Sequence, residues 1–315
     1  IGTRCRRLCA PEPGHAAELI MSDSALLAQS RACRVDTHAH VFERGLPLTD
    51  GRRYAPDYDA TLDTYLQLLN AHGIERAVLV QPSFLGTDNR YLLQALSRDR
   101  RRLRGVAVVT PNVSEKELAA LHAQGVTGIR LNLIGQALPD LAANSWTPLR
   151  ERLSELGWHV ELHRNAQDLA PLLDQLLKAG VPVVVDHFGR PDPQKGVHDP
   201  GFRSLLGYGE TGRVWVKVSG AYRCAASGSD FVRDAMCQLL EHFGARRLMW
   251  GSDWPHTQHE QVMNYGESLS TLLEPGMDAT AIDAILCTTP ASFYGFEQES
   301  GKDTASTTTL LQRVS

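Results

Sequence analysis

From Val35 onward, short runs of apolar and β-branched residues alternate with longer stretches whose apolar residues recur at helical intervals. This alternation is typical of βα units that build a parallel sheet. Eight runs are predicted to be strands: Arg34–His38, Ala77–Gln81, Gly105–Thr110, Gly128–Leu133, His159–His163, Pro182–His187, Val214–Ser219 and Leu248–Asp253. Five stretches have the periodicity of amphipathic helices: Thr61–Ala71, Glu115–Ala123, Pro148–Leu156, Leu169–Ala179 and Phe231–Phe243.

The strands recur roughly every 30 residues, which is the spacing of βαβ crossovers. No glycine-rich dinucleotide fingerprint accompanies them, so we expect an α/β protein with a distorted TIM (β/α)8 barrel and not a doubly wound sheet. The barrel is expected to form a single domain over residues 31–297. Residues 1–30 are expected to be a disordered or artefactual segment, and residues 298–315 a flexible tail.

Composition narrows the classes of function. The 315 residues are 43% hydrophobic and 22% charged, with a formal net charge of −4, so no basic field would gather nucleic acid. No apolar run approaches the roughly 18 residues that span a bilayer, and we expect no membrane partner. The six cysteines include no Cys-x-x-Cys pair and signal neither a zinc knuckle nor a disulfide framework, which fits the cytoplasm. The sequence leaves open whether the protein forms a homo-oligomer.

Active sites of these barrels lie at the carboxyl ends of the strands, where this chain has many polar residues. A mouth built only for stability would not need them, because unpaired polar groups in a concave site cost free energy. The expected substrate-binding residues are Arg130, Arg190, Arg223, Ser83, Thr87, Asn132, Lys217 and Tyr222. The arginines suit a carboxylate or sulfonate, although pairing with acids across the barrel is equally open for Arg130 and Lys217.

The strand-end histidines predict a hydrolytic centre. His38 and His40 are two residues apart on one strand, so their imidazoles share a face. The expected metal ligands are His38, His40, His163 and Asp253, with His187 as a further candidate, and the ion would be Zn²⁺ or, as an alternative, Mn²⁺. In a metal-free alternative, the imidazoles bind the substrate directly.

Four of these residues are the expected catalytic groups: His38, His40, His187 and Asp253. Asp253 could act as a general base that takes a proton from water and returns it to the leaving group. Structural roles are the alternatives, with His163 and His187 as core residues and Asp253 as a helix cap. His159 is expected to face the surrounding helices.

Several motifs resemble those of the amidohydrolase superfamily, in the amidohydrolase-2 branch that includes pyrone-dicarboxylate lactonases and sulfomuconolactone hydrolases. The likeness spans Val35 to Phe296, and its pieces are Asp36–Phe42, Gln81–Ser83, Gly86–Asn89, Gly105–Val109, Gly128–Asn132, Gly157–Val160, Asp186–Asp192 and Trp250–His256. The resemblance implies a distorted (β/α)8 barrel in which Asp253 activates water for attack on a lactone carbonyl.

Two positions depart from the pyrone-dicarboxylate lactonases. His163 replaces a tyrosine, and Gln136 replaces a second arginine after the fourth strand. The resemblance thus favours a hydrolase that opens the lactone of a small anionic ring compound, such as a pyrone carboxylate, a muconolactone or a sugar-acid lactone. Because His163 restores a ligand of metal-dependent relatives, a metal-dependent decarboxylase of an aromatic or unsaturated acid is one alternative. A non-catalytic ligand-binding barrel is another.

Overall fold

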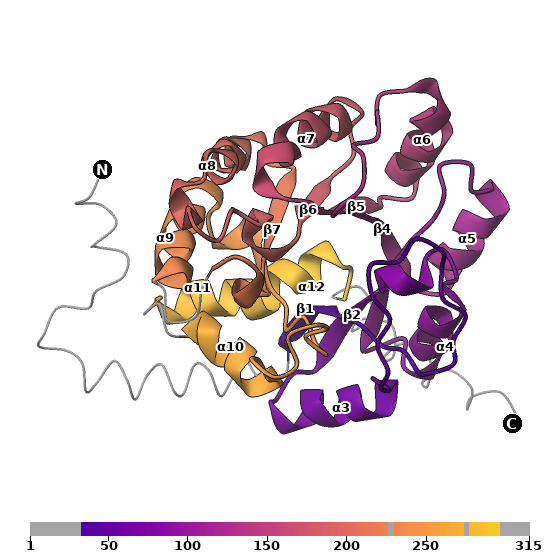
Figure 1. Ribbon diagram of the computed structural model, residues 1–315, viewed down its shortest axis with the longest axis horizontal. Coiled ribbons are helices and arrows are strands. Elements are labelled where there is room, and N and C mark those ends of the chain that lie inside the picture. Colours follow the sequence, from indigo (N-terminus) through magenta and orange to yellow (C-terminus); the bar gives the residue numbers. More distant parts are fainter. Residues whose placement is uncertain (1–32, 226–229, 274–276, 297–315) are drawn as a thin grey trace, which may run out of the picture.

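A computed structural model describes residues 33–225, 230–273 and 277–296 (Figure 1). Its eight parallel strands are paired in sequence order, which confirms the predicted barrel. The strands are β1 (Val35–Ala39), β2 (Arg76–Val80), β3 (Leu103–Ala107), β4 (Val126–Asn132), β5 (His159–His163), β6 (Val183–Val185), β7 (Val214–Val218) and β8 (Leu248–Trp250). Their bounds lie within three residues of the predicted ones. The predicted terminal segments 1–30 and 298–315 lie outside the described residues.

Hydrogen bonds between the ends of β1 and β8 close the barrel. The His40 amide donates to the Trp254 carbonyl and the Asp253 amide to the His38 carbonyl, each at 2.8 Å. Gly251 permits this approach, because a Cβ there would lie 2.6 Å from His38 Cβ. The segment that holds Asp253 is therefore fixed directly against the strand that holds His38 and His40.

Helices surround the strands (Figure 1). The five predicted helices are confirmed as α3 (Leu62–Ala71), α5 (Glu115–Ala123), α6 (Thr147–Glu155), α7 (Leu169–Lys178) and α9 (Phe231–Phe243). The pattern did not predict α4 (Arg90–Arg98), α8 (Pro200–Leu206), α10 (Tyr265–Leu273), α11 (Ala279–Asp283) and α12 (Thr289–Phe293). In α7 the buried leucines Leu169, Leu172, Leu173 and Leu176 recur at helical spacing, so this face packs inward.

The amino-terminal end of the barrel is filled by residues at the end of α12. Tyr294 and Phe296 join the cluster of Val78, Val106 and other strand residues. The expectation that His159 faces the helices is wrong, because its ring packs against Tyr294, with 5.5 Å between ring centroids. Residues four apart in a strand share a face, so His159 has the same inward direction as His163, further toward the bottom of the barrel.

None of the helices in the described part of the chain is long and apolar enough to cross a membrane.

Candidate active site

Three predicted histidines surround one oxygen of Asp253. The Nε2 atoms of His38, His40 and His187 lie 3.8, 3.9 and 3.9 Å from Asp253 Oδ1. All four side chains are nearly or fully buried. Strands β1 and β6 and the segment after β8 thus bring the four expected catalytic residues together, as the barrel prediction requires.

The Nδ1 atoms of His40 and His187 each contact a hydrogen-bonding group, and both rings are neutral. His40 Nδ1 lies 2.7 Å from the Val80 carbonyl oxygen, which can only accept, so Nδ1 holds the proton and Nε2 a lone pair. His187 Nδ1 lies 2.9 Å from Ser219 Oγ. Burial lowers the pKa of His40 to about 4 and that of His187 to about 3, so both rings are neutral at ordinary pH.

The imidazole nitrogens and carboxylate oxygens around His38 fit a divalent cation. His38 Nε2 is buried and meets no hydrogen-bond partner in the described part of the chain. His38, His40 and Asp253 offer ligand atoms within 4.8 Å of one another, and so do His38, Asp186 and His187. Imidazole nitrogens and carboxylate oxygens are ordinary ligands of zinc and manganese.

His163, an expected metal ligand, packs its ring against that of His187, with 4.9 Å between the ring centroids, but it is not in either group of described residues that could share an ion. Its Nδ1 is 3.2 Å from Arg130 Nη2, and its Nε2 is 3.2 Å from Arg190 Nη1. A guanidinium offers only donors and a neutral imidazole accepts at only one nitrogen, so no more than one of these two contacts is a hydrogen bond. In this geometry His187, the further candidate, takes the position beside Asp253 that was expected of His163.

The second oxygen of Asp253 is held by two donors from the segment after β7. Tyr222 Oη donates at 2.6 Å and Arg223 Nε at 2.7 Å, both to Oδ2. Burial favours the neutral carboxyl, but the Arg223 guanidinium and the neighbouring imidazoles together outweigh burial and hold the pKa of Asp253 well below its usual range. The carboxylate is therefore ionised, with Oδ2 anchored and Oδ1 facing the imidazoles.

Arg130 and Lys217, both expected to bind substrate, pair with acids across the barrel. Arg130 donates to Asp186 Oδ2 from Nη2 at 2.9 Å and from Nε at 3.1 Å. Lys217 is fully buried and donates to Glu161. The open alternative for these two cations, pairing with carboxylates, is thus the arrangement found.

The other expected substrate-binding residues are spread around the mouth. Ser83 is in a short helix just after β2, and Thr87 is exposed on the loop that follows. Asn132 ends β4 and accepts a hydrogen bond of 3.4 Å from Arg53 Nη2. Arg190 is partly buried, and no described contact pairs its guanidinium with a carboxylate.

Two further residues belong to the site although the strand pattern gave them no role. Arg53 lies on the loop between β1 and α3, where no periodicity singles it out, and its pKa is lowered by partial burial and by the charges of Arg130 and Arg223. Asp36 is fully buried, and its Oδ1 accepts from the amides of His38 at 3.1 Å and Ser252 at 2.9 Å. Asp36 therefore ties the His38 segment to the Asp253 segment.

Comparison with known proteins identifies the family. A family model described as amidohydrolase matches residues 35–296. The chain belongs to the amidohydrolase family. This confirms the resemblance drawn from the motifs.

Among related amidohydrolases, a 2-pyrone-4,6-dicarboxylate hydrolase of Comamonas testosteroni is 35% identical over 70% of this chain and 76% of its own length. A 4-sulfomuconolactone hydrolase of Hydrogenophaga intermedia is 30% identical over 82% of this chain and 88% of its own. A Pseudomonas putida structure described as a 2-pyrone-4,6-dicarboxylic acid hydrolase is 50% identical, with a TM-score of 0.80, over 84% of this chain and 98% of that one. A Burkholderia multivorans amidohydrolase with bound zinc, 21% identical, shares the fold with a TM-score of 0.67 over 84% of this chain and 99% of that one.

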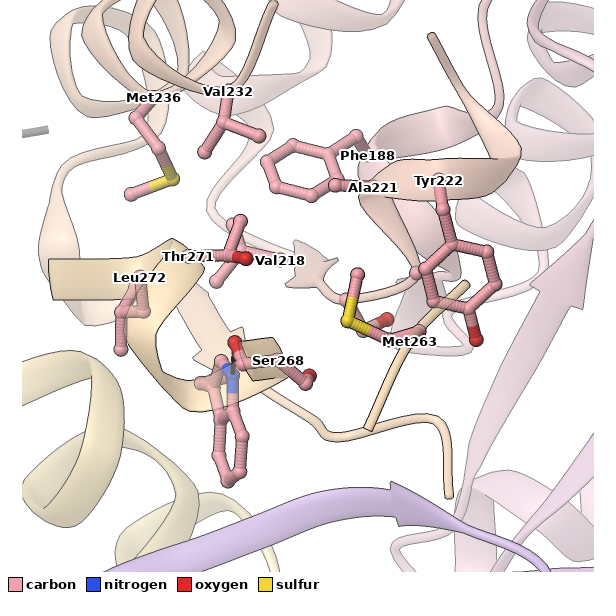
Figure 2. Close-up of a pocket in the computed structure, with 13 residues that line it drawn as sticks. Phe188, Val218, Ala221, Tyr222, Val232, Met236, Met263, Ser268, Thr271 and Leu272 are labelled. Atoms are coloured by element: carbon pink, nitrogen blue, oxygen red, sulfur yellow. Dashed lines mark hydrogen bonds between the residues drawn. The ribbon is translucent and has the colours of Figure 1, made fainter. Parts of the chain in front are cut away.

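Beside the cluster around Asp253 lies a largely apolar pocket. Figure 2 shows Phe188, Val232, Met236 and Leu272 around it, with Tyr222 at its edge. None of the four catalytic candidates lines this pocket. The pocket is connected to the candidate site through Tyr222, which lines the pocket and donates a hydrogen bond to Asp253.

Proposed function

We propose that this amidohydrolase hydrolyses the lactone of a small anionic ring compound, with Asp253 as the general base. The observation that supports this most is the asymmetry of the Asp253 carboxylate. Oδ2 is anchored by Tyr222 and Arg223, while Oδ1 faces three imidazoles and no hydrogen-bond donor among the described contacts. An ionised oxygen that is fixed in place but not occupied can accept a proton from a water molecule.

In the proposed reaction, a water oxygen attacks the lactone carbonyl carbon while one of its protons passes to Asp253 Oδ1. The ring C–O bond of the tetrahedral intermediate then breaks, and Asp253 returns the proton to the leaving oxygen. The products are one carboxylate and one hydroxyl group, and the enzyme regains its initial state. The rigid attachment of Asp253 to β1 and to Tyr222 keeps the base in position through both proton transfers.

We assign His38, His40 and His187 as the residues that would hold a divalent ion beside the Asp253 carboxylate, with zinc preferred and manganese as the alternative. When bound, such an ion polarises a carbonyl and lowers the pKa of water. The unpartnered Nε2 of His38 and the lone pair of His40 Nε2 support this assignment.

The guanidinium groups at the mouth support an anionic substrate. Burial lowers the pKa of Arg190, and the positive charges of Arg223 and Arg53 lower it further. An acid group bound between these cations would relieve their mutual repulsion, and planar carboxylates and sulfonates match a guanidinium fork. Pyrone carboxylates, muconolactones and sugar-acid lactones are therefore the proposed substrates.

A panel of these lactones, assayed with metal-quantified protein, tests the proposal. We expect ring opening with release of acid and no CO₂, and its loss in Asp253→Asn, which keeps the shape of the side chain but cannot accept the proton. Release of CO₂ from an aromatic acid would instead identify the decarboxylase alternative. Binding of lactones without any turnover would indicate a non-catalytic barrel.

A further inference from the structure

A buried network of charges lies directly beneath His38. Asp186 Oδ1, Glu161 Oε1 and Lys217 Nζ lie 3.3, 3.4 and 3.2 Å from His38 Nδ1. These groups are each no more than 1% exposed. They sit one layer below the mouth, where the proposed reaction gives them no direct role, so their function must act through His38.

The hydrogen bonds of the two acids differ. Asp186 Oδ2 accepts from two guanidinium nitrogens of Arg130, whereas Asp186 Oδ1 has no partner in the described part of the chain unless His38 Nδ1 donates to it. Glu161 already accepts from the Lys217 ammonium through Oε2. A buried carboxylate oxygen without a donor is costly, and the His38 ring is the donor that Asp186 Oδ1 can reach.

The competing arrangement has Lys217 Nζ donating to His38 Nδ1 at 3.2 Å, a contact that has hydrogen-bond geometry in the structure, whereas the 3.3 Å approach of Asp186 Oδ1 is an ion-pair contact. It would leave Asp186 Oδ1 without a donor, whereas Glu161 Oε1 lies 3.5 Å from Arg130 Nε in either arrangement. It would also place the ring proton on Nε2, pointing toward Asp253 Oδ1 at 3.8 Å. A donor would then face the oxygen of the base that the proposed reaction leaves free for the proton of water.

We propose that Asp186 is a positioning residue that accepts the Nδ1 proton of His38, while Arg130 holds its other oxygen. The chain Arg130–Asp186–His38 fixes the tautomer in which His38 Nε2 presents a lone pair to the space beside Asp253. A carboxylate that orients an imidazole in this way also orients histidines that ligate metals. The inference rests on the proposed function for its catalytic consequence, but the tautomer itself is a property of the free protein.

Imidazole nitrogen NMR of uniformly ¹⁵N-labelled wild-type protein measures the tautomer without any substrate. The His38 signals are assigned by their loss in His38→Gln. We expect a protonated Nδ1 and an unprotonated Nε2. A protonated Nε2 in metal-free protein would overturn the inference. Because this experiment needs no turnover, its outcome does not depend on whether the proposed lactonase activity is correct.

The variant Asp186→Asn tests the cause. Its amide oxygen can still accept from Arg130, but the NH₂ group then facing His38 Nδ1 can only donate, so the ring proton should move to Nε2. We expect kcat for lactone hydrolysis to fall by about 10²- to 10⁴-fold while KM changes little. The matched control Asp174→Asn, at an exposed acid of α7, should leave both the His38 signals and kcat unchanged.

Two outcomes of the variant would contradict the inference: an unchanged His38 tautomer, or wild-type kcat with the proton on Nε2. A tautomer that switches in protein whose wild type opens no lactone would support the positioning role and refute the proposed function. If Asp186→Asn does not fold, the wild-type spectrum alone decides.

Discussion

Tyr222 donates its hydroxyl proton to Asp253 Oδ2 across 2.6 Å, from the wall of the apolar pocket. The contact joins a residue of the segment after β7 to the proposed base after β8. Arg223 Nε reaches the same oxygen at 2.7 Å. Two donors on one oxygen leave the other as the reactive one, so the orientation of the base depends on this pair.

Removing the hydroxyl should therefore impair the reaction more than the fold. We expect Tyr222→Phe to lower kcat by about 10- to 100-fold, the range for a lost hydrogen bond to a charged group, with a small change in KM. Tyr208→Phe is the matched control, because Tyr208 donates to Asp174 at 2.7 Å on the protein surface. Steady-state kinetics of both variants measure the difference, and equal effects would show that the Asp253 contact has no special role.

Gly220 sits against the same group and has a left-handed φ of 57°. A Cβ there would lie 2.9 Å from His187 Nδ1 and 3.1 Å from Asp253 Oδ2. We expect Gly220→Ala to lose at least about 10-fold in kcat, because either side chain must move, and to lose about 1 kcal/mol of stability from backbone strain.

The control variant Gly157→Ala separates the effect of backbone strain from the effect of displaced side chains. Gly157 has a φ of 65°, but a Cβ there meets nothing within 4 Å. Its unfolding free energy should fall by a similar amount while kcat stays at the wild-type value. A comparable loss of kcat in both variants would contradict the contact with His187 and Asp253 as the cause.

The barrel and the residues at its mouth were predictable because strand periodicity fixes which face a side chain occupies. His38, His40, His187 and Asp253 all lie where the carboxyl ends of β1, β6 and β8 place them. Helices α5 and α9 have the bounds that the pattern predicted. Local pattern suffices for these features, since each depends on one segment and on the general geometry of the barrel.

Periodicity does not indicate depth along the barrel axis. Lys217 and Glu161 have the inward parity of site residues, but they lie before the ends of β7 and β5, one layer below the mouth, where they pair with each other. Arg130 pairs with Asp186 for the same reason. His163 is at the mouth, but its ring contacts Arg130 and Arg190. Its orientation therefore depends on residues from neighbouring strands, which the periodicity of one strand does not predict.

Arg53 gives a prediction about substrate charge. Its guanidinium contacts Asn132, and its Cδ lies 3.7 Å from where a Cβ on Gly135 would be, so it covers the loop that follows β4. That loop has Gln136 where related lactonases were expected to have an arginine. Arg53 therefore supplies a cation to this side of the mouth from a different loop.

We expect Arg53→Met to raise KM about 10- to 100-fold for a lactone with two acid groups, and far less for one with a single acid group. The adjacent Arg52→Met is the control, because Arg52 is exposed like Arg53 but donates to the Thr49 carbonyl at 3.1 Å and not to Asn132. Equal KM changes for both kinds of lactone would rule out a direct contact between Arg53 and the second acid group.

His159 should make stability depend on pH. Burial, with a further contribution from Lys217, lowers the pKa of His159 to about 3, against an ordinary value of 6.5. The unfolded chain therefore binds this proton between pH 6.5 and 3, while the folded protein does not. The contribution of His159 to the free energy of unfolding rises with pH across this range and is fully present above pH 6.5. Each pH unit below 6.5 costs about 1.4 kcal/mol per such histidine, or about 2 kcal/mol at pH 5.

Denaturant unfolding of wild type and His159→Gln from pH 8 to pH 5 isolates this contribution from those of the other buried histidines. We expect the variant to lose less stability than wild type on acidification, by about 2 kcal/mol at pH 5. His198→Gln removes an exposed imidazole and should follow the wild-type curve. Parallel curves for wild type and His159→Gln would mean that His159 is already protonated in the folded barrel, against the close packing of its ring on Tyr294.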